Sequence, residues 1–147
     1  MTRRDLPEVL KIERLSFSNP WPPSTFEGEI QNIGLSNPIV ATDEETGKIA
    51  GYIITWLIRD EAQINNLAVH PDCRRRRIAE DMLRGMLDTL KEQGIQFVSL
   101  EVRSGNVAAR TLYDKLGFKP IGLRKDYYSN PAEDAVVMGL TFGSAPI

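Results

Sequence analysis

The feature that most constrains the fold is a change of hydrophobic period between residues 62 and 90. Residues 62–69 favour a β-strand, whereas the apolar residues that follow recur on one face of a helix. This helical face carries Ile78, Met82, Met86, Leu87 and Leu90. Gly94 is a suitable C-terminal stop, because glycine adopts the left-handed conformation that ends many helices. The pattern therefore predicts a strand and a long helix joined by a loop that begins at His70.

Further patterns place this pair within a mixed α/β (α+β) domain. Helices are expected over residues 5–17, over a second segment capped by Ser24 or Thr25, and from the cap Asn106 to residue 117. Strands are expected over residues 38–42, 49–58, 62–69, 95–102, 121–128 and 135–142. The first three strands are expected as consecutive antiparallel neighbours and the last two as a hairpin. We expect one domain over residues 1–147.

Rare residues exclude several kinds of site. Cys73 is the only cysteine, which excludes an internal disulfide and a cysteine-based zinc site. A Ser-His-Asp or Cys-His mechanism would need the only histidine, His70, but His70-Pro71-Asp72 also reads as a turn that leaves a strand. The formal net charge of −2 creates no broad field that favours nucleic acid.

Composition is typical of a soluble domain, with 41% hydrophobic and 26% charged residues. No apolar run approaches the roughly 20 residues that span a bilayer. The N-terminal residues lead into Leu6-Pro7-Glu8 rather than into an apolar segment, so they do not resemble a signal peptide. We therefore expect a cytoplasmic protein without a membrane role.

Arginines crowd the loop between the strand and the long helix. Arg74, Arg75, Arg76 and Arg77 stand directly before the helix. Free backbone N–H groups and the positive end of the helix dipole bind a diphosphate at such a junction, and arginine side chains add charge-assisted contacts. A solvated basic turn or an RNA-contact patch would have the same composition. The loop by itself leaves these three interpretations open.

Several motifs together resemble one enzyme family. The run Ile64-Asn65-Asn66-Leu67-Ala68-Val69-His70-Pro71, followed by the arginines, resembles motif A of the GNAT N-acetyltransferases. The RimI branch of that family, which acetylates protein N-termini, is similar in Leu100–Arg103, Asn106, Ala108-Ala109, residues 112–118, Arg124–Tyr128 and Glu133-Asp134-Ala135. The resemblance covers nearly the whole chain.

This resemblance implies the GNAT fold and an acetyl-transfer reaction. The fold has a central, mixed and mostly antiparallel twisted sheet of about seven strands, flanked by about four helices. The implied cosubstrate is acetyl-CoA, and no metal is expected. The expected acceptor is a protein N-terminus, such as that of an alanine-starting ribosomal protein. We expect a monomer or weak homodimer with no direct nucleic-acid role.

The resemblance assigns the general base to Glu101, acting through a water, and the general acid to Tyr113. These residue types suit the chemistry, because an α-ammonium of pKa ~8 must lose a proton before it attacks a thioester. A carboxylate accepts a proton at neutral pH, whereas a phenol of pKa ~10 keeps one for the departing thiolate. Without the resemblance, Glu101 reads as the polar face of a strand and Tyr113 as a helix residue one turn before Leu116.

The resemblance also assigns the contacts with acetyl-CoA. The backbone of Leu67, Ala68 and Val69 would pair with the pantetheine arm and polarise the acetyl carbonyl, and Asn106 would contact CoA. The phosphate contacts fall on Arg74, Arg75, Arg76, Arg77, Ile78 and Ala79.

One residue departs from the family's loop pattern, Q/R-x-x-G-x-G/A. Arg74 and Ala79 fit, but Arg77 stands at the first glycine. A β-carbon there would obstruct the phosphates, or cost about 1 to 2 kcal/mol if the backbone is left-handed. The charge of Arg77 could offset part of that loss.

Acceptor specificity is harder to read from the residues. Trp21, in a proline-rich loop, and the pair Tyr127-Tyr128 could wall a peptide groove, or they could belong to the core. Cys73 precedes the phosphate loop and is expected nearer the diphosphate than the thioester, which favours direct attack by the amine.

Alternative functions are acetylation of a lysine or polyamine, a non-catalytic acyl-CoA-binding module made possible by Arg77, and nucleic-acid binding through the arginines.

Overall fold

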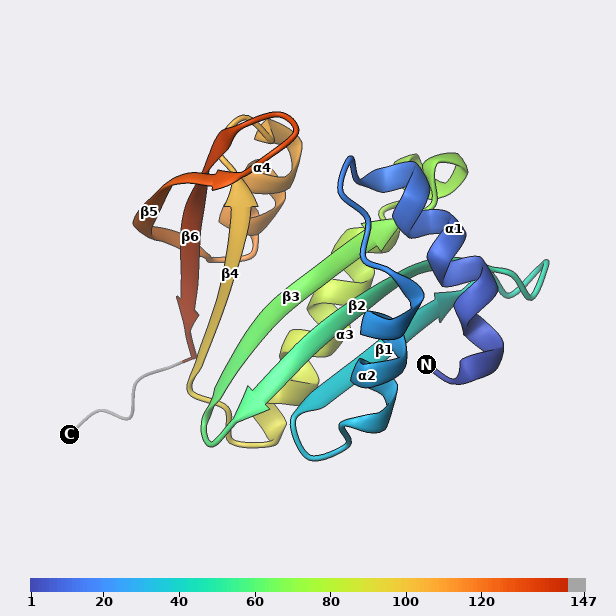
Figure 1. Ribbon diagram of the computed structural model, residues 1–147. Helices are drawn as coiled ribbons and strands as arrows, with labels where there is room; N and C mark the ends of the chain where they lie inside the picture. Colours follow the sequence, from blue (N-terminus) through green and yellow to red (C-terminus); the bar gives the residue numbers. More distant parts are fainter. Residues whose placement is uncertain (143–147) are drawn as a thin grey trace.

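The structure is a computed structural model that describes residues 1–142, apart from the side chains of Arg75 and Arg76 (Figure 1). Its helices are α1 (Leu6–Ser16), α2 (Pro23–Gln31), α3 (Ile78–Glu92) and α4 (Val107–Lys115). Its strands are β1 (Ser36–Thr42), β2 (Ile49–Ile58), β3 (Glu61–Val69), β4 (Phe97–Arg103), β5 (Lys119–Tyr128) and β6 (Glu133–Thr141). Two 3-10 turns cover Arg3–Asp5 and Pro71–Arg76.

One sheet runs through these residues in the order β1-β2-β3-β4-β6-β5. Only β3 and β4 are parallel, and the other neighbours are antiparallel. The expected mixed, mostly antiparallel sheet is therefore confirmed, with six strands among the described residues instead of about seven. The segment ahead of α1 forms the 3-10 turn Arg3–Asp5 and adds no strand.

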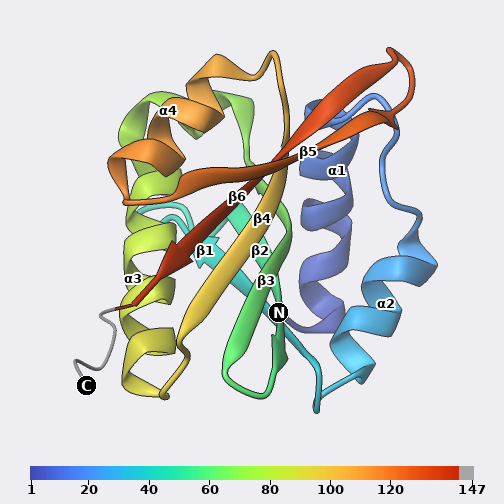
Figure 2. The same cartoon turned by 90° about the vertical axis from the view of Figure 1, so that its left-hand side faces the viewer.

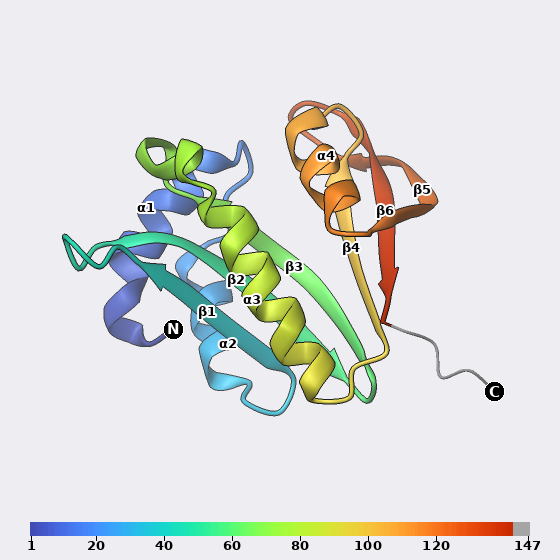
Figure 3. The ribbon, with the colours of Figure 1, turned by 180° about the vertical axis from the view of Figure 1, so that it is seen from behind.

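Helices cover both faces of the sheet. Figure 2 shows α1 and α2 on one side and α3 and α4 on the other, with the strands between them. Seen from behind, α3 crosses the β2–β3 half of the sheet while α4 lies beside β4 (Figure 3). Within the described residues, none of the helices has the length and apolar character needed to cross a bilayer.

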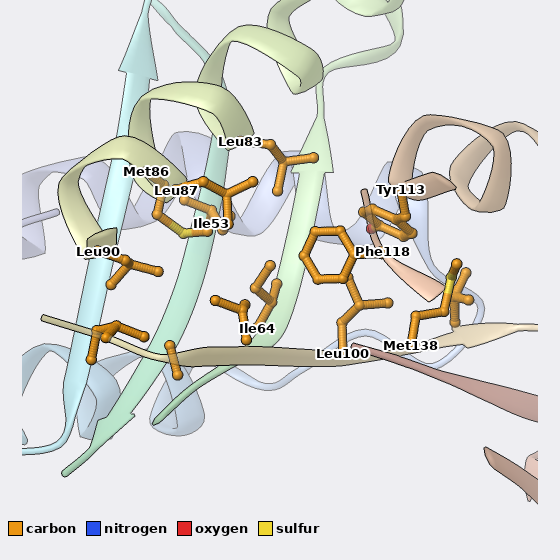
Figure 4. Close-up of a cluster of buried hydrophobic side chains, with 14 of the residues drawn as sticks. Ile53, Ile64, Leu83, Met86, Leu87, Leu90, Leu100, Tyr113, Phe118 and Met138 are labelled. Atoms are coloured by element: carbon orange, nitrogen blue, oxygen red, sulfur yellow. The ribbon is translucent and has the colours of Figure 1, made fainter. Parts of the chain in front are cut away.

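Two hydrophobic clusters fill these layers. Successive residues of a strand point to opposite faces, so Ile53 joins the cluster under α3 while Tyr52 and Ile54 join the cluster under α1. Figure 4 shows the first cluster, in which Leu83 and Leu90 of α3 extend toward Ile53 and the cluster continues to Phe118. Burial of both faces holds the central strands in a single register.

The sheet divides between β3 and β4. These strands pair only where residues 61–64 lie beside residues 97–100. Beyond that point Asn66–Val69 pairs with β2 alone and Glu101–Arg103 with β6 alone, and the two strands diverge (Figure 1). Asn65 is an extra residue in the β2–β3 register, and such a bulge bends and twists the strand that carries it. We call these two diverging segments the fork.

Helix capping follows the prediction at one helix and not at another. The Asn106 side chain caps α4 as expected, because its Oδ1 accepts from the Ala109 N–H at 3.2 Å. The cap expected at Ser24 or Thr25 is wrong, since α2 begins at Pro23 with Pro22 as its N-cap and no side-chain cap bond. Proline suits the first helical position because its ring presets φ and it lacks an N–H.

Candidate active site

The β3 side of the fork presents unpaired backbone groups. The His70 N–H donates to the Ala50 carbonyl at 2.7 Å, and pairing alternates along an antiparallel ladder. The backbone groups of Ala68 therefore face β2, whereas those of Leu67 and Val69 face the fork. Consistent with this direction, the Val69 carbonyl accepts from Arg74 Nε at 3.2 Å rather than from β2. An extended ligand can pair with Leu67 and Val69 as a strand would.

The arginine loop, residues 70–77, connects β3 to α3. His70 begins it as the predicted turn, since its Nδ1 accepts from the Asp72 N–H at 3.1 Å. Arg74 also donates to Ser16 Oγ at 3.3 Å, which ties the loop to the end of α1. The side chains of Arg75 and Arg76 lie outside the described residues.

Arg77 ends this loop in the left-handed conformation, with φ 60° and ψ 23°. A non-glycine residue adopts that conformation at a cost of about 1 to 2 kcal/mol. The first turn of α3 follows directly, and Arg77 provides no side-chain cap for it. The N–H groups of Ile78, Ala79 and Glu80 precede the first intrahelical bond, from the Asp81 N–H to the Arg77 carbonyl at 2.9 Å. This helix start is thus suited to an anion.

An acidic residue in the same turn is neutralised. Glu80 contacts Lys115 Nζ at 2.8 Å and Arg84 Nε at 3.0 Å. The hydrogen bond from Lys115, followed by that from Arg84, lowers the pKa of Glu80 to about 2. These cations reduce the repulsion between Glu80 and an anion at the helix start.

Glu101 lies on the β4 side of the fork, opposite Val137 of β6. Its side chain is only 15% exposed, and Oε1 lies 3.1 Å from Arg124 Nε. The Tyr127 hydroxyl also hydrogen-bonds to this carboxylate, which is the largest cause of the raised pKa of Tyr127. Two residues of β5 therefore hold the predicted base.

Tyr113 lies on α4, the helix that directly follows the strand of Glu101 in the chain. The residue is 8% exposed, and its ring packs edge-on against Phe118 with centroids 5.8 Å apart (Figure 4). Burial, and secondarily the neighbouring Tyr128, raises the pKa of Tyr113 to about 12. The phenol therefore keeps its proton at neutral pH, as a general acid must.

Tyr128 links the two predicted catalytic residues. Its ring lies 5.1 Å from that of Tyr127, and the Arg103 guanidinium lies 4.4 Å from its centroid. Burial and then the charge of Glu101 raise the pKa of Tyr128 to about 12. Glu101 and Tyr127 thus lie with Tyr128 beside the fork, and Tyr128 is near enough to Tyr113 to raise its pKa.

Trp21 is not part of that group. Its ring packs on Phe26 with centroids 5.3 Å apart, in the cluster under α1. The loop that carries it nevertheless reaches the tyrosines, because Asn19 Nδ2 donates to the Ser129 carbonyl at 2.9 Å (Figure 2). The α1–α2 loop and the β5–β6 loop therefore meet near the fork.

Two side-chain groups near the site were not foreseen. Glu13 is buried beneath the α1–α2 loop, and its only sequence signal is a carboxylate next to the buried Ile12. Arg124 was noted only as part of a motif, although it contacts Glu101 directly. Among the described residues, no cluster of three or more His, Cys, Asp or Glu side chains could hold a metal ion.

Comparison with known proteins connects this geometry to a family. Residues 6–118 match the sequence profile of the acetyltransferase (GNAT) family. Over 142 residues the chain is 35% identical to the ribosomal protein bS18-alanine N-acetyltransferase of Salmonella typhimurium, covering 95% of this chain and 93% of that one.

Solved structures agree with the sequence matches. The ribosomal-protein-S18-alanine N-acetyltransferase from Escherichia coli superposes with a TM-score of 0.90 at 34% identity, covering 99% of this chain and 93% of that one. Ard1 from Thermoplasma volcanium shares the fold, with a TM-score of 0.86 at 24% identity, over 98% of this chain and 95% of that one.

Proposed function

The chain belongs to the acetyltransferase (GNAT) family, and on this premise we propose that it acetylates the N-terminal α-amine of a protein. The proposed acceptor is an alanine-starting ribosomal protein of the bS18 type, because relatives at 35% and 34% identity are named for that reaction. The observation that carries the proposal is the group formed by Glu101, Tyr113, Tyr127 and Tyr128 beside the fork.

The residues around the fork fit acetyl-CoA. The backbone of Leu67 and Val69 faces the fork and would bind the pantetheine arm, and Ala68 holds the strand between them in register with β2. Arg77, Ile78 and Ala79 would bind the diphosphate at the uncapped start of α3, together with Arg74, Arg75 and Arg76. Asn106 would contribute a further CoA contact at the start of α4. The bound cosubstrate supplies the thioester that carries the acetyl group.

Glu101 and Tyr113 divide the proton transfers. We assign Glu101 as the group that accepts the proton of the incoming ammonium, through a water, because its carboxylate is held at the edge of the fork. Tyr113 carries a proton on Oη, which it gives to the thiolate sulfur as the thioester bond breaks. Its raised pKa of about 12 means that the hydroxyl is protonated at neutral pH and is present as a donor when the thiolate leaves.

The acceptor would enter between the two loops that meet near the fork. Tyr127 and Tyr128 lie on the β5–β6 side, and Trp21 lies under the α1–α2 loop. Tyr127 is exposed and can contact a peptide directly, whereas Trp21 packs into the core and is assigned to shaping its loop.

The decisive experiment is an acetyl-transfer assay with short peptides that differ at the N-terminal residue. We expect thiol release with free alanine N-termini and none with N-acetylated copies. Product formed only on polyamines or on lysine side chains would replace this proposal, and tight acetyl-CoA binding without any turnover would favour a non-catalytic module.

The remaining assignments are one domain over residues 1–147, a monomer or weak homodimer, and a cytoplasmic site of action.

A further inference from the structure

The carboxylate of Glu101 already has a cationic partner. Arg124 Nε lies 3.1 Å from Oε1, and the two side chains differ in exposure, 15% for Glu101 and 58% for Arg124. Glu101 is fixed on β4 by the pairing of that strand with β6, whereas the guanidinium extends from an edge strand into solvent. Arg124 is therefore the partner that can leave with little disturbance of the fold.

Arg124 lies on the same face of the sheet as Glu101, because it lies opposite Ala135, which lies opposite Arg103; a bulge follows Arg124 in β5. Arg124 lies opposite Ala135 and Tyr128 opposite Glu133, so the three residues between them lie opposite Asp134 alone. Asp126 closes this bulge with φ 51°, and its N–H donates to Asp134 Oδ1 at 2.9 Å.

The bulge changes which side chains share a face. In a regular strand, residues three apart point to opposite faces. Here Arg124 and Tyr127 contact the same carboxylate, and the Arg124 guanidinium also lies 5.5 Å from the Tyr127 ring. Bulges commonly re-aim side chains next to active sites. The irregularity thus creates a cation site formed by one carboxylate and one aromatic ring.

This cation site has the chemistry that an acceptor amine needs. An α-amine of pKa ~8 arrives mostly as the ammonium and must lie near the base that receives its proton. A guanidinium keeps its proton in proteins and cannot take part in that transfer. Arg124 Nε occupies Oε1 of Glu101, so an ammonium that approaches this oxygen, directly or through a water, must take the place of the guanidinium.

We propose that Arg124 is a resident counterion of Glu101 that the α-ammonium of the acceptor displaces. The inference rests on the proposed function, and it assigns the selection of a free N-terminus to the pair formed by Arg124 and Glu101. A free N-terminus can replace the guanidinium beside Glu101, with the water of the proton transfer between the ammonium and the carboxylate, whereas an acylated N-terminus carries no charge and cannot. After transfer the product is a neutral amide, so Arg124 returns to Glu101 and favours release.

Kinetics of a charge-removing variant test the displacement. Arg124→Met keeps the length of the side chain and removes the competing cation. We expect the acceptor KM to fall by about two- to fivefold, the range set by weak, partly exposed ion pairs. Lys125→Met removes the same charge one residue away and should leave the KM within about twofold. An unchanged or raised KM in Arg124→Met would overturn displacement and leave Arg124 as a residue that only orients the base.

A second measurement follows Arg124 in the unaltered protein. The NMR signal of the Arg124 Nε–H, assigned by its loss in Arg124→Lys, should shift and exchange faster with water when an alanine-starting peptide binds. The N-acetylated peptide should leave that signal in place. If a peptide binds and is acetylated while the Nε–H signal stays unchanged, the displacement is refuted and the proposed function stands. A peptide that shifts no signal and is not acetylated removes the proposed function, and the displacement with it.

Discussion

The side-chain Nδ2 of Asn66 donates to Glu13 Oε1 at 2.8 Å. This hydrogen bond joins α1 to the part of β3 that enters the fork. Glu13 is 1% exposed. The same carboxylate accepts from the Tyr52 hydroxyl and, at 2.9 Å, from the backbone N–H of Trp21. Three donors from β2, β3 and the α1–α2 loop thus converge on one buried group. The loop on the acceptor side is held to the sheet by a carboxylate that has no part in the proposed transfer chemistry.

Glu13→Gln should destabilise the protein, because the new amide group turns one acceptor into a donor that faces other donors. A buried polar group left without its partner costs about 1 to 3 kcal/mol. Urea unfolding should show a loss of that size. Glu27→Gln, which alters an exposed glutamate of α2, should change the unfolding free energy by less than about 0.5 kcal/mol. Equal stability of the two variants would refute this account of Glu13.

Glu101→Gln and Tyr113→Phe should each reduce turnover by about 10²- to 10⁴-fold, because each removes one proton transfer. Acetyl-CoA affinity, measured by calorimetry, should stay near the wild-type value, since neither side chain belongs to the start of α3 or to the backbone of β3. Normal turnover in both variants would contradict the assignment of base and acid.

Arg77→Gly should stabilise the protein by about 0.5 to 1 kcal/mol, because the relief of left-handed strain exceeds the added freedom of the unfolded chain. Arg77→Ala removes the same charge but keeps a β-carbon, so it should not be stabilising. The pair also tests the departure from the family's loop. Calorimetry should show tighter acetyl-CoA binding in Arg77→Gly than in Arg77→Ala, and equal affinities would mean that the β-carbon does not obstruct the phosphates.

Glu80 should make stability depend on pH in the acid range. Its pKa is lowered from 4.5 to about 2 in the folded protein, chiefly by the hydrogen bond from Lys115. A lowered folded pKa means that the stabilisation is complete above pH 4.5 and is lost as the pH falls through about 2. We expect Glu80→Gln to unfold at lower urea than wild type at about pH 6, with the difference vanishing near about pH 2. Glu92→Gln, at the end of the same helix, should show no such convergence.

Short-range patterns carried much of the fold prediction. The α3 helix and the Asn106 cap depend on residues within a few positions of each other, and both are confirmed. The predicted helix face is confirmed at Met86, Leu87 and Leu90, but it omitted the fully buried Leu83, and Ile78 and Met82 are only half-buried. A cost was expected at Arg77 if its backbone is left-handed, because the family has a glycine there, and the backbone is left-handed. The α2 cap was misassigned because Pro23 competes with Ser24 and Thr25 for the helix start.

Other features of the site could not be read from the residues. The contact of Arg124 with Glu101 depends on the placement of β6 between β4 and β5 and on the register of both pairings, which puts the two side chains on one face. Trp21 had two open interpretations, groove or core; its half-buried ring packs on Phe26 at the edge of the cluster under α1, and its role toward the acceptor stays a prediction. Glu13 gave a weak signal, because a carboxylate beside a buried isoleucine is also common on solvated helix faces.

The sequence by itself determined the order of strands and helices, the arginine-rich start of α3 and the residue types that suit acetyl transfer. These depend on period, capping and turn chemistry, which act over a few residues. Only the tertiary structure decided that β3 and β4 diverge after Ile64, that Leu67 and Val69 face the fork, and that Arg124 pairs with Glu101. Pairing register and bulges set those contacts, and both arise between segments that are distant in the chain.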